Sequence, residues 1–354
     1  MSNTDKILMV ALFLVIMLAT MFSRNGRLYS TNVFHSEEPV DLYLEDRENL
    51  YDLARAIEEQ QLVFDRKEFL WAARTLGWRS FSPGRYLIEI GLSYDQFFSK
   101  LGRGLQDPVR VTILPGIDIK RLSASLDRQL RSDSSAFLEI FSDSSAIALE
   151  KNMSSEELFS RMLPETYEMY WTSEPEAVID RVLRAFHNRV EEGLNEEVKE
   201  HSLTLDEVVT LASIVEWEAR YADEKRRIAG LYSNRLERNM PLQADPTVIY
   251  AIGERRRLLY EDYRIDHPYN TYLIRGLPPG PITNPDLQSI RAVLNPEEHD
   301  YLYMVATPEG RHRFSETFQE HREASEEWRR WIREQYRIKR ERERAEQQGS
   351  SGSP

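Results

Sequence analysis

LDEVVTLASIVEWEARYA, from Leu205 to Ala222, is one of the most apolar helical stretches in the chain. Thr204 and Glu207 have the spacing of a capping box, so the helix is predicted to begin here. Its apolar run ends in Glu216 and Glu218. Two carboxylates at the end of an apolar helix need a chemical or a structural reason.

The two acids are predicted to face different surroundings. At about 100° per residue, Glu218 lies near Ile214 and Val215, whereas Glu216 can pair with Arg220 at position i+4. Burial raises the pKa of a carboxyl group and keeps it protonated near neutral pH, as a general acid requires. Glu218 is therefore the candidate acid, although the spacing also fits two solvated residues at a helix end.

Two polar segments follow this helix. PLQADPTVIY (241–250) and PYNTYLIRGLPPGPITNP (268–285) are dense in amides, hydroxyls, Tyr, Pro and Gly. Such residues could bind a polar polymer such as a glycan, and they equally favour Asx and proline turns. The candidate binding residues are Gln243, Asp245, Thr247, Tyr250, Asn270, Thr271 and Tyr272.

The composition excludes several classes of function. The chain has 354 residues, 41% of them hydrophobic, which is enough for two or three folded domains. A net charge of −13 argues against a nucleic-acid partner. The absence of cysteine excludes disulfides and thiol chemistry, and the seven His form no HExxH pattern. No metal or cofactor is indicated.

The N-terminus carries a charge-free apolar run, Ile7–Phe22. At about 1.5 Å per residue it spans roughly 24 Å, slightly less than a bilayer core. A cleaved signal peptide is the alternative, but no A-x-A-like site follows, so a retained single-pass anchor is predicted. Arg24 and Arg27 after the run offset Lys6 before it, so charge bias alone does not orient the chain.

Taken in order, the segments resemble a known family. ASIVEWEA, MPLQADPTVIY, PYNTYLIRGLPPGPITNP, YLYMVA and HRFSETFQEH are similar to the endolytic murein transglycosylases of the MltG (YceG-like) family, over about 205–321. Upstream, SPGRYLIEIGLSYDQFFSKLGRG and VRVTILPGIDIKRLSASL resemble its LysM-like subdomain. Trp217 departs from the pattern, because the family usually has a basic residue there.

The resemblance implies an enzyme of the bacterial cell wall. Such proteins are anchored in the cytoplasmic membrane with the catalytic domain outside the cytoplasm. They cleave peptidoglycan glycan strands internally, between N-acetylmuramic acid and N-acetylglucosamine, and leave 1,6-anhydro ends without consuming water. The family's catalytic glutamate aligns with Glu218, with Glu216 as the second possibility. Peptidoglycan synthases (penicillin-binding proteins) are the expected protein partners.

We therefore expect an α+β protein with an N-terminal transmembrane helix, a small LysM-like subdomain and a mixed α/β catalytic domain with a glycan-binding cleft. The expected boundaries are an anchor at 1–23, a linker at 24–38, the LysM-like subdomain at 39–130, the catalytic domain at 131–340 and a disordered tail at 341–354.

Two other functions stay open. A hydrolytic muramidase would need a second acid, for which Asp245 is the nearby candidate. A non-catalytic wall-binding scaffold could use the LysM-like unit and the charged C-terminal helix.

Overall fold

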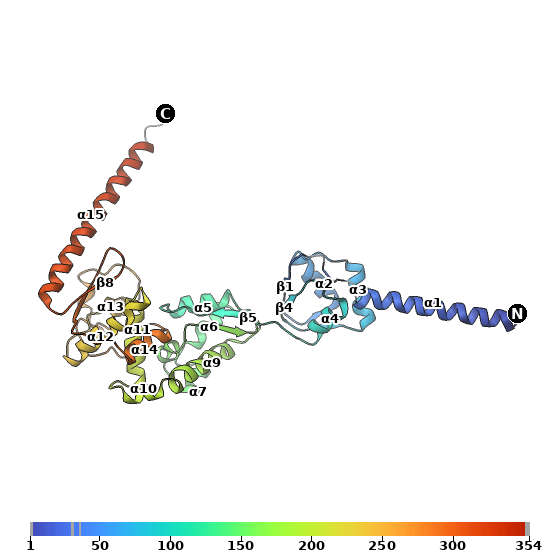
Figure 1. Ribbon diagram of the computed structural model, residues 1–354, viewed down its shortest axis with the longest axis horizontal. Helices are drawn as coiled ribbons and strands as arrows, with labels where there is room; N and C mark the ends of the chain where they lie inside the picture. Colours follow the sequence, from blue (N-terminus) through green and yellow to red (C-terminus); the bar gives the residue numbers. More distant parts are fainter. Residues whose placement is uncertain (1–2, 30–31, 35–36, 351–354) are drawn as a thin grey trace. The chain divides into compact units, whose positions relative to one another are not determined.

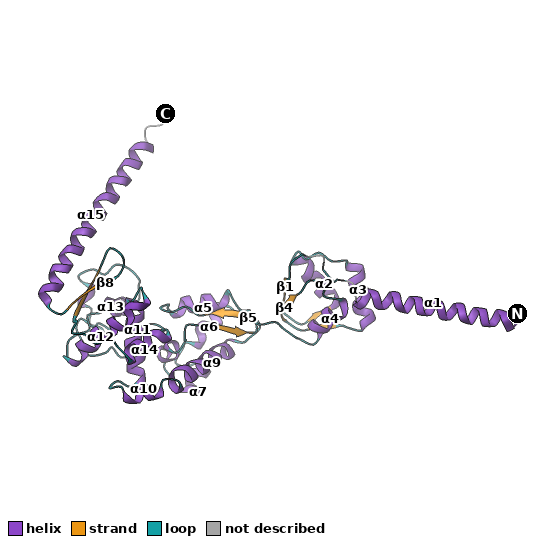
Figure 2. Cartoon of the chain, viewed as in Figure 1, coloured by secondary structure: helices purple, strands orange, loops and turns teal. Residues whose placement is uncertain are grey.

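The computed structural model describes residues 3–29, 32–34 and 37–350, and the side chains through residue 343. The chain divides into two compact units (Figures 1 and 2). The first comprises Met1–Val111, Ala124–Ser134 and Thr166–Pro175, and the second comprises Thr112–Ser123, Ser135–Glu165 and Glu176–Pro354. The predicted boundary at residue 130 differs from this division, because 112–123 group with the second unit.

Short antiparallel strand pairs and the helices α2, α3 and α4 form most of the first unit after its N-terminal helix. The strand β1 (Val40–Leu44) pairs antiparallel with β4 (Gly84–Ile88), with Leu42 opposite Tyr86. Between them lie α2 (Leu50–Glu59) and α3 (Arg66–Leu76), and α4 (Tyr94–Gly102) follows. The short strands β2 (Glu48–Asn49) and β3 (Ser80–Phe81) also pair, as do β5 (Val109–Thr112) and β6 (Thr166–Met169).

The core of this unit is aromatic. Phe69, Phe97 and Phe98 are fully buried and their rings lie within 4.8–5.8 Å of one another. Local capping sets the helix ends: Asp65 accepts from two backbone amides at the start of α3, and Gly77 ends α3 in the left-handed conformation that glycine adopts without strain.

The predicted linker is wrong. The first helix, α1 (Asn3–Tyr29), contains the apolar run and continues into the folded unit, where Leu28 is buried. Val33 and Phe34 are buried in the same aromatic core, so residues placed in a polar linker are core residues. Their apolar character is visible in the sequence, but only the fold supplies the surface that covers them.

The second unit is mainly helical and packs around α11 (Leu205–Glu218). The helices α12 (Lys225–Glu237), α13 (Asp245–Ile252) and α14 (Leu287–Leu294) contact α11. A hairpin of β7 (Tyr303–Ala306) and β8 (His312–Ser315) precedes α15 (Phe318–Ser350). The smaller helices are α5 (Ile119–Asp127), which crosses between the units in sequence, α6 (Ser134–Ile140), α7 (Ala146–Lys151), α8 (Ser155–Ser160), α9 (Pro175–Phe186) and α10 (Asn195–Glu200).

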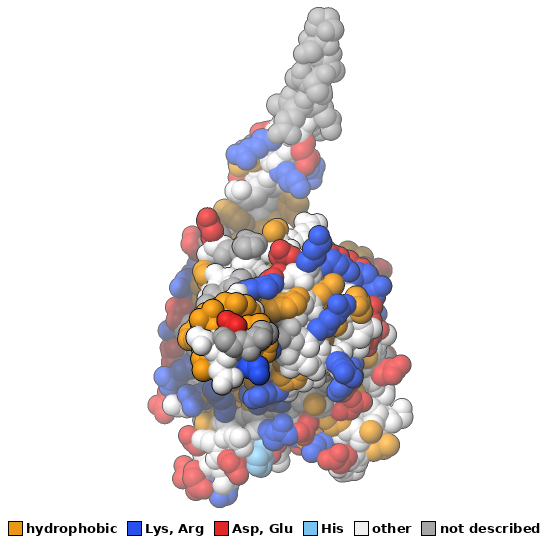
Figure 3. All heavy atoms as spheres, turned by 90° about the vertical axis from the view of Figure 1, so that its right-hand side faces the viewer, with side chains coloured by type: hydrophobic (Ala, Val, Ile, Leu, Met, Phe, Trp, Pro, Cys, Tyr) orange, Lys and Arg blue, Asp and Glu red, His pale blue; other side chains and the backbone are white. Residues whose placement is uncertain are grey.

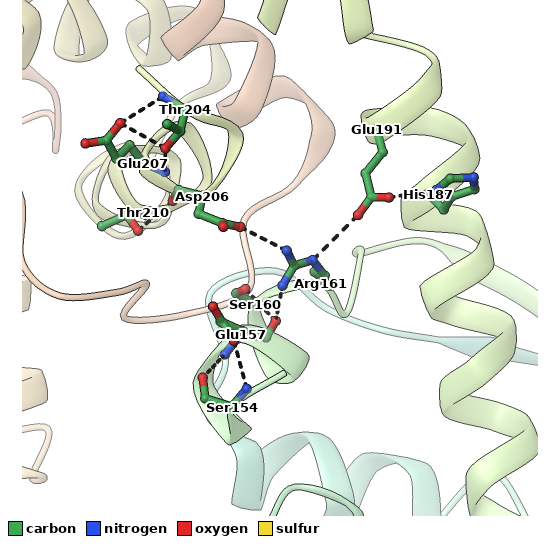
Figure 4. Close-up of polar contacts among 10 residues, drawn as sticks. All are labelled: Ser154, Glu157, Ser160, Arg161, His187, Glu191, Thr204, Asp206, Glu207 and Thr210. Atoms are coloured by element: carbon green, nitrogen blue, oxygen red, sulfur yellow. Dashed lines mark hydrogen bonds and ion pairs between the residues drawn. The ribbon is translucent and has the colours of Figure 1, made fainter. Parts of the chain in front are cut away.

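The start of α11 is held as the sequence predicts. Thr204 and Glu207 form the reciprocal capping box, with Glu207 accepting from the Thr204 amide at 2.8 Å (Figure 4). Asp206 accepts from Arg161 at 2.9 Å, and Arg161 also lies 3.7 Å from Glu191. The N-terminal end of α11 is therefore held by Arg161, which also contacts Glu191. This contact helps to fix the position of the C-terminal end of the same helix.

The predicted tail at 341–354 is wrong in part. Helix α15 continues through Ser350, and residues 351–354 lie outside the described residues. Alternating Arg and Glu at 340–344 allow pairing three or four residues apart, as between Arg337 and Glu341, which favours a continued helix.

Candidate active site

Glu218 is the last residue of the buried helix α11. Eight consecutive residues, 208–215, are buried, which fixes the helix rigidly up to its final turn. The next residue, Ala219, is extended (φ −77°, ψ 105°), so the helix stops at the acid. The carboxyl group is half-buried and accepts a hydrogen bond from the Tyr232 hydroxyl of α12 at 3.2 Å.

The surroundings of Glu218 favour its neutral form. Loss of hydration, reinforced by the negative charge of Asp245, raises the pKa of Glu218 to about 7, and the Tyr232 hydrogen bond opposes this shift. None of these neighbours is a cation. At neutral pH a large fraction of this carboxyl group is therefore protonated, as a general acid requires.

Glu216 has the opposite environment. Its Oε2 accepts from the Lys225 ammonium group at 2.9 Å, the Ser289 hydroxyl at 2.7 Å and the Asp286 amide at 3.1 Å. The side chains of Glu216 and Lys225 are only 8% and 7% exposed. The expected pairing with Arg220 is wrong, because Lys225 of the adjacent helix takes that place. Glu216 joins α11, α12 and α14 and is not among the residues that line the pocket beside Glu218.

Asp245 begins α13 and lies in the same pocket as Glu218. Its Oδ1 accepts from the Tyr272 hydroxyl at 2.6 Å and its Oδ2 from the Tyr263 hydroxyl at 3.4 Å. The two rings contact each other edge to face, with centroids 4.6 Å apart. Burial and the Asp245 charge raise the pKa of Tyr263 to about 12 and that of Tyr272 still higher, so both phenols remain hydrogen-bond donors.

These groups line an open pocket of about 460 Å³. Gln243, in a left-handed backbone conformation, reaches its wall and accepts from Arg235 at 3.2 Å. The sequence interpretation missed several wall residues, because they come from α12, the β7–β8 hairpin and the charged helix α15: Tyr232, Arg235, Tyr303, His312, His321 and Trp328. In α15, the aromatic residues spaced through a highly charged helix were the sequence signal that could have indicated a pocket wall.

Three predicted binding residues are structural. Thr247, Asn270 and Thr271 are fully buried. The Thr247 and Thr271 hydroxyls lie 2.8 Å apart, and Thr271 also accepts from the Ala244 amide. Asn270 donates to the carbonyl groups of Tyr263 and Ile265. Their predicted direct contact with a ligand is wrong; they shape the turns that present Asp245 and Tyr272.

Tyr250 lies apart from the Glu218 pocket. Its ring packs on Tyr269 at 4.6 Å and lines a second hollow of about 330 Å³, which also contains Trp217. The Arg255 guanidinium lies 4.2 Å from the centre of the Trp217 ring. Within the residues that the structure describes, no group of three or more His, Asp or Glu could hold a metal ion.

Known proteins resemble this chain over most of its length. An endolytic murein transglycosylase of Bacillus subtilis (strain 168) is 28% identical over 311 residues, which cover 83% of this chain and 86% of that protein. The endolytic murein transglycosylase of Streptococcus pneumoniae strain D39 is 28% identical, and the match covers 77% of this chain but 55% of that longer protein.

The fold has a solved counterpart. The 2.6 Å crystal structure of a yceG-like protein from Listeria monocytogenes matches with a TM-score of 0.57 and 26% identity, and the match covers 82% of this chain and all of that one. The sequence pattern described as the YceG-like family matches residues 42–327, which include all the residues that line the Glu218 pocket except Trp328. The chain belongs to the YceG-like family.

Proposed function

We propose that the chain is an endolytic murein transglycosylase and that Glu218 is its single acid and base. The observation that carries this proposal is the position of Glu218, a half-buried carboxyl group whose pKa is raised to about 7, in an open pocket lined by aromatic and polar side chains. The relatives named endolytic murein transglycosylase support the reaction class.

The reaction needs one carboxyl group used twice. Glu218 donates its proton to the glycosidic oxygen, so the bond from that oxygen to C1 of N-acetylmuramic acid breaks and the electron pair leaves with the oxygen. The C6 hydroxyl of the same sugar attacks C1, and its proton passes to the Glu218 carboxylate. The products are a free 4-hydroxyl on N-acetylglucosamine and a 1,6-anhydro end, and Glu218 is again protonated.

The neighbours of Glu218 have separate roles in this proposal. The Tyr232 hydroxyl donates to Oε1, which leaves Oε2 as the oxygen that carries the proton. The Asp245 carboxylate keeps the pKa of Glu218 high and is itself held by Tyr272. Gln243, Tyr303 and Trp328 form walls on which sugar rings could stack or hydrogen-bond.

The other parts of the chain fit an enzyme that works at the membrane. α1 is long and apolar enough to cross a bilayer, and we propose a single-pass protein with both folded units outside the cytoplasm. We further propose that the β1–α2–α3–β4 unit is the LysM-like module that holds the glycan strand. Peptidoglycan synthases (penicillin-binding proteins), which produce uncrosslinked strands, are the proposed partners.

Product mass tests the proposal. The full chain in detergent, as wild type and Glu218→Gln, would be incubated with uncrosslinked glycan strands and the ends measured by mass spectrometry. We expect anhydro ends, lighter by one water, from the wild type alone. Reducing ends would favour a muramidase with Asp245 as second acid. Equal cleavage by both proteins would exclude Glu218.

Glu216→Gln is the matched control. It alters the neighbouring acid of the same helix end without changing the pocket wall, and anhydro ends should still form at temperatures where the variant is folded. Circular dichroism of all three proteins would separate loss of chemistry from loss of fold.

A further inference from the structure

The anchor helix enters the first unit without a flexible joint. α1 ends inside the core, with Leu28 only 3% exposed. Directly after it, Val33 donates to the Leu92 carbonyl at 3.1 Å, and Phe34 packs edge to face on Phe97 at 5.5 Å. The direction of α1 therefore sets the orientation of the whole first unit relative to a membrane that α1 crosses.

Helix α3 lies beside the exit of α1. Arg27 of α1 donates to both carboxylate oxygens of Glu68, and its guanidinium lies 3.8 Å from the centre of the Trp71 ring. Figure 3 looks from the N-terminal end and shows the apolar side chains of α1 end-on, with Lys and Arg side chains beside them. The contacts of Arg27 with Glu68 and Trp71 join α1 to α3, so α3 keeps a fixed position next to α1.

The two faces of α3 differ. Its inner face, with Phe69, Ala72 and Ala73, is buried in the aromatic core. Its outer face presents Lys67, Leu70, Trp71 and Arg74, which line a shallow hollow. These residues recur at helical spacing and combine cations with a Trp and a Leu, a composition typical of helices that lie in the interface of a bilayer.

Distances along α1 bring this face to the lipid headgroups. The apolar run ends at Phe22, and Leu28 follows six residues later, about 9 Å along the helix axis. The headgroup layer is about 5–7 Å thick on each side of a hydrocarbon core of about 30 Å. Because the apolar run spans only about 24 Å, the mismatch draws the residues after Phe22 toward the bilayer.

We propose that the outer face of α3, formed by Lys67, Leu70, Trp71 and Arg74, is a membrane-contact surface that lies in the headgroup layer. The charge of this face supports a lipid partner. The whole chain has a net charge of −13, but this face carries Lys67 and Arg74, and Glu68 beside it is paired with Arg27. Cations near an anionic bilayer are attracted to it, and Trp residues are enriched at the membrane–water interface. The proposal does not depend on the catalytic assignment.

The cysteine-free chain permits a clean test. Lys67→Cys and, as a control, Asp46→Cys would each carry one environment-sensitive fluorophore on the full chain in lipid nanodiscs that contain a quencher attached to the headgroups. Asp46 is exposed in the bend after β1, and the label of β1 lies on the opposite side of this unit from α1 in Figure 1. We expect several-fold stronger quenching at position 67 than at position 46.

A second variant tests the rigid joint. Ten Gly/Ser residues inserted between Ser23 and Arg24 leave every core residue of the first unit in place but separate it from the membrane helix. Quenching at position 67 should fall toward that at position 46, most clearly in nanodiscs of neutral lipid. Equal quenching at both positions in the uninterrupted chain, with the thermal unfolding curve unchanged by labelling, would overturn the proposal.

Discussion

Glu218 and Glu216 are two residues apart on one helix, yet the protein gives them opposite electrostatic environments. Glu216 accepts from a buried ammonium group, which it shares with Asp286, and from two further donors, so its charged form is stabilised. Glu218 meets one phenol and a second carboxylate, so its charged form is penalised. The difference comes from the neighbouring helices and not from the acids themselves.

The first prediction concerns pH. Because Glu218 must be protonated to donate a proton, kcat/KM should fall as pH rises through about 7. Asp245→Asn removes a negative charge that raises this pKa, so the fall should begin at lower pH. The pH profile of glycan cleavage by both proteins measures this; an alkaline limb that does not move would contradict the role of Asp245.

The second prediction concerns Glu216. Glu216→Gln leaves Lys225 buried with Asp286 as its remaining ionic partner, at 2.8 Å. We expect a loss of about 1.5–3 kcal/mol in the free energy of unfolding, measured in urea, because the hydrogen bonds that Lys225 and Ser289 donate to the Glu216 carboxylate are weakened. The Glu216→Gln/Lys225→Met variant should lose less than the sum of the two single losses. Additive losses in the double variant would show that the two side chains act independently.

Among the elements of the second unit, the start of α13, with Ala244 before it, is joined to the loop at 269–272. The buried hydroxyls of Thr247 and Thr271 join them, while Tyr272 reaches out of the same loop to Asp245. Thr271 and Tyr272 are adjacent in the chain, yet Thr271 holds two segments together and Tyr272 lines the pocket.

The third prediction uses this separation. Thr271→Val should lower the free energy of unfolding by about 1–3 kcal/mol, because the Ala244 amide loses its buried acceptor. Tyr272→Phe removes only the hydroxyl that holds Asp245, so it should lower kcat/KM for glycan cleavage with a smaller effect on stability. Thermal unfolding and the kinetics of glycan cleavage by both variants test this prediction. A large loss of stability in Tyr272→Phe with unchanged kcat/KM would show that Tyr272 is structural.

In the whole molecule, the apolar helix α1 belongs to the same compact unit as the strands and helices that follow it. A soluble form that begins at residue 24 keeps Leu28 and the Arg27–Glu68 ion pair, whereas one that begins at residue 30 loses both.

The fourth prediction follows from that joint. The shorter form should be less stable by about 2–3 kcal/mol in the first unit, because it no longer buries the Leu28 side chain. Circular dichroism during urea unfolding of the two forms measures the difference. Identical curves would show that the end of α1 does not contribute to the core.

Features that depend on local patterns are predictable from the sequence. Composition and helical periodicity predict the apolar run of α1 and the capping box that starts α11, and the structure confirms both. Tyr272, Gln243 and Asp245 were also recognisable, because polar and aromatic residues in Pro-rich turns favour exposed positions.

Which of these groups meet depends on the tertiary structure. Leu28, Val33 and Phe34 of the expected linker are core residues because the aromatic core of the first unit covers them. Thr247 and Thr271 are internal because the start of α13 and the loop at 269–272 close on each other. Glu216 is neutralised by a lysine nine residues away on another helix. The burial and the charge pairing of a side chain depend on neighbours from other elements. The sequence can therefore indicate a candidate acid, but its pKa depends on the neighbours that the fold brings to it.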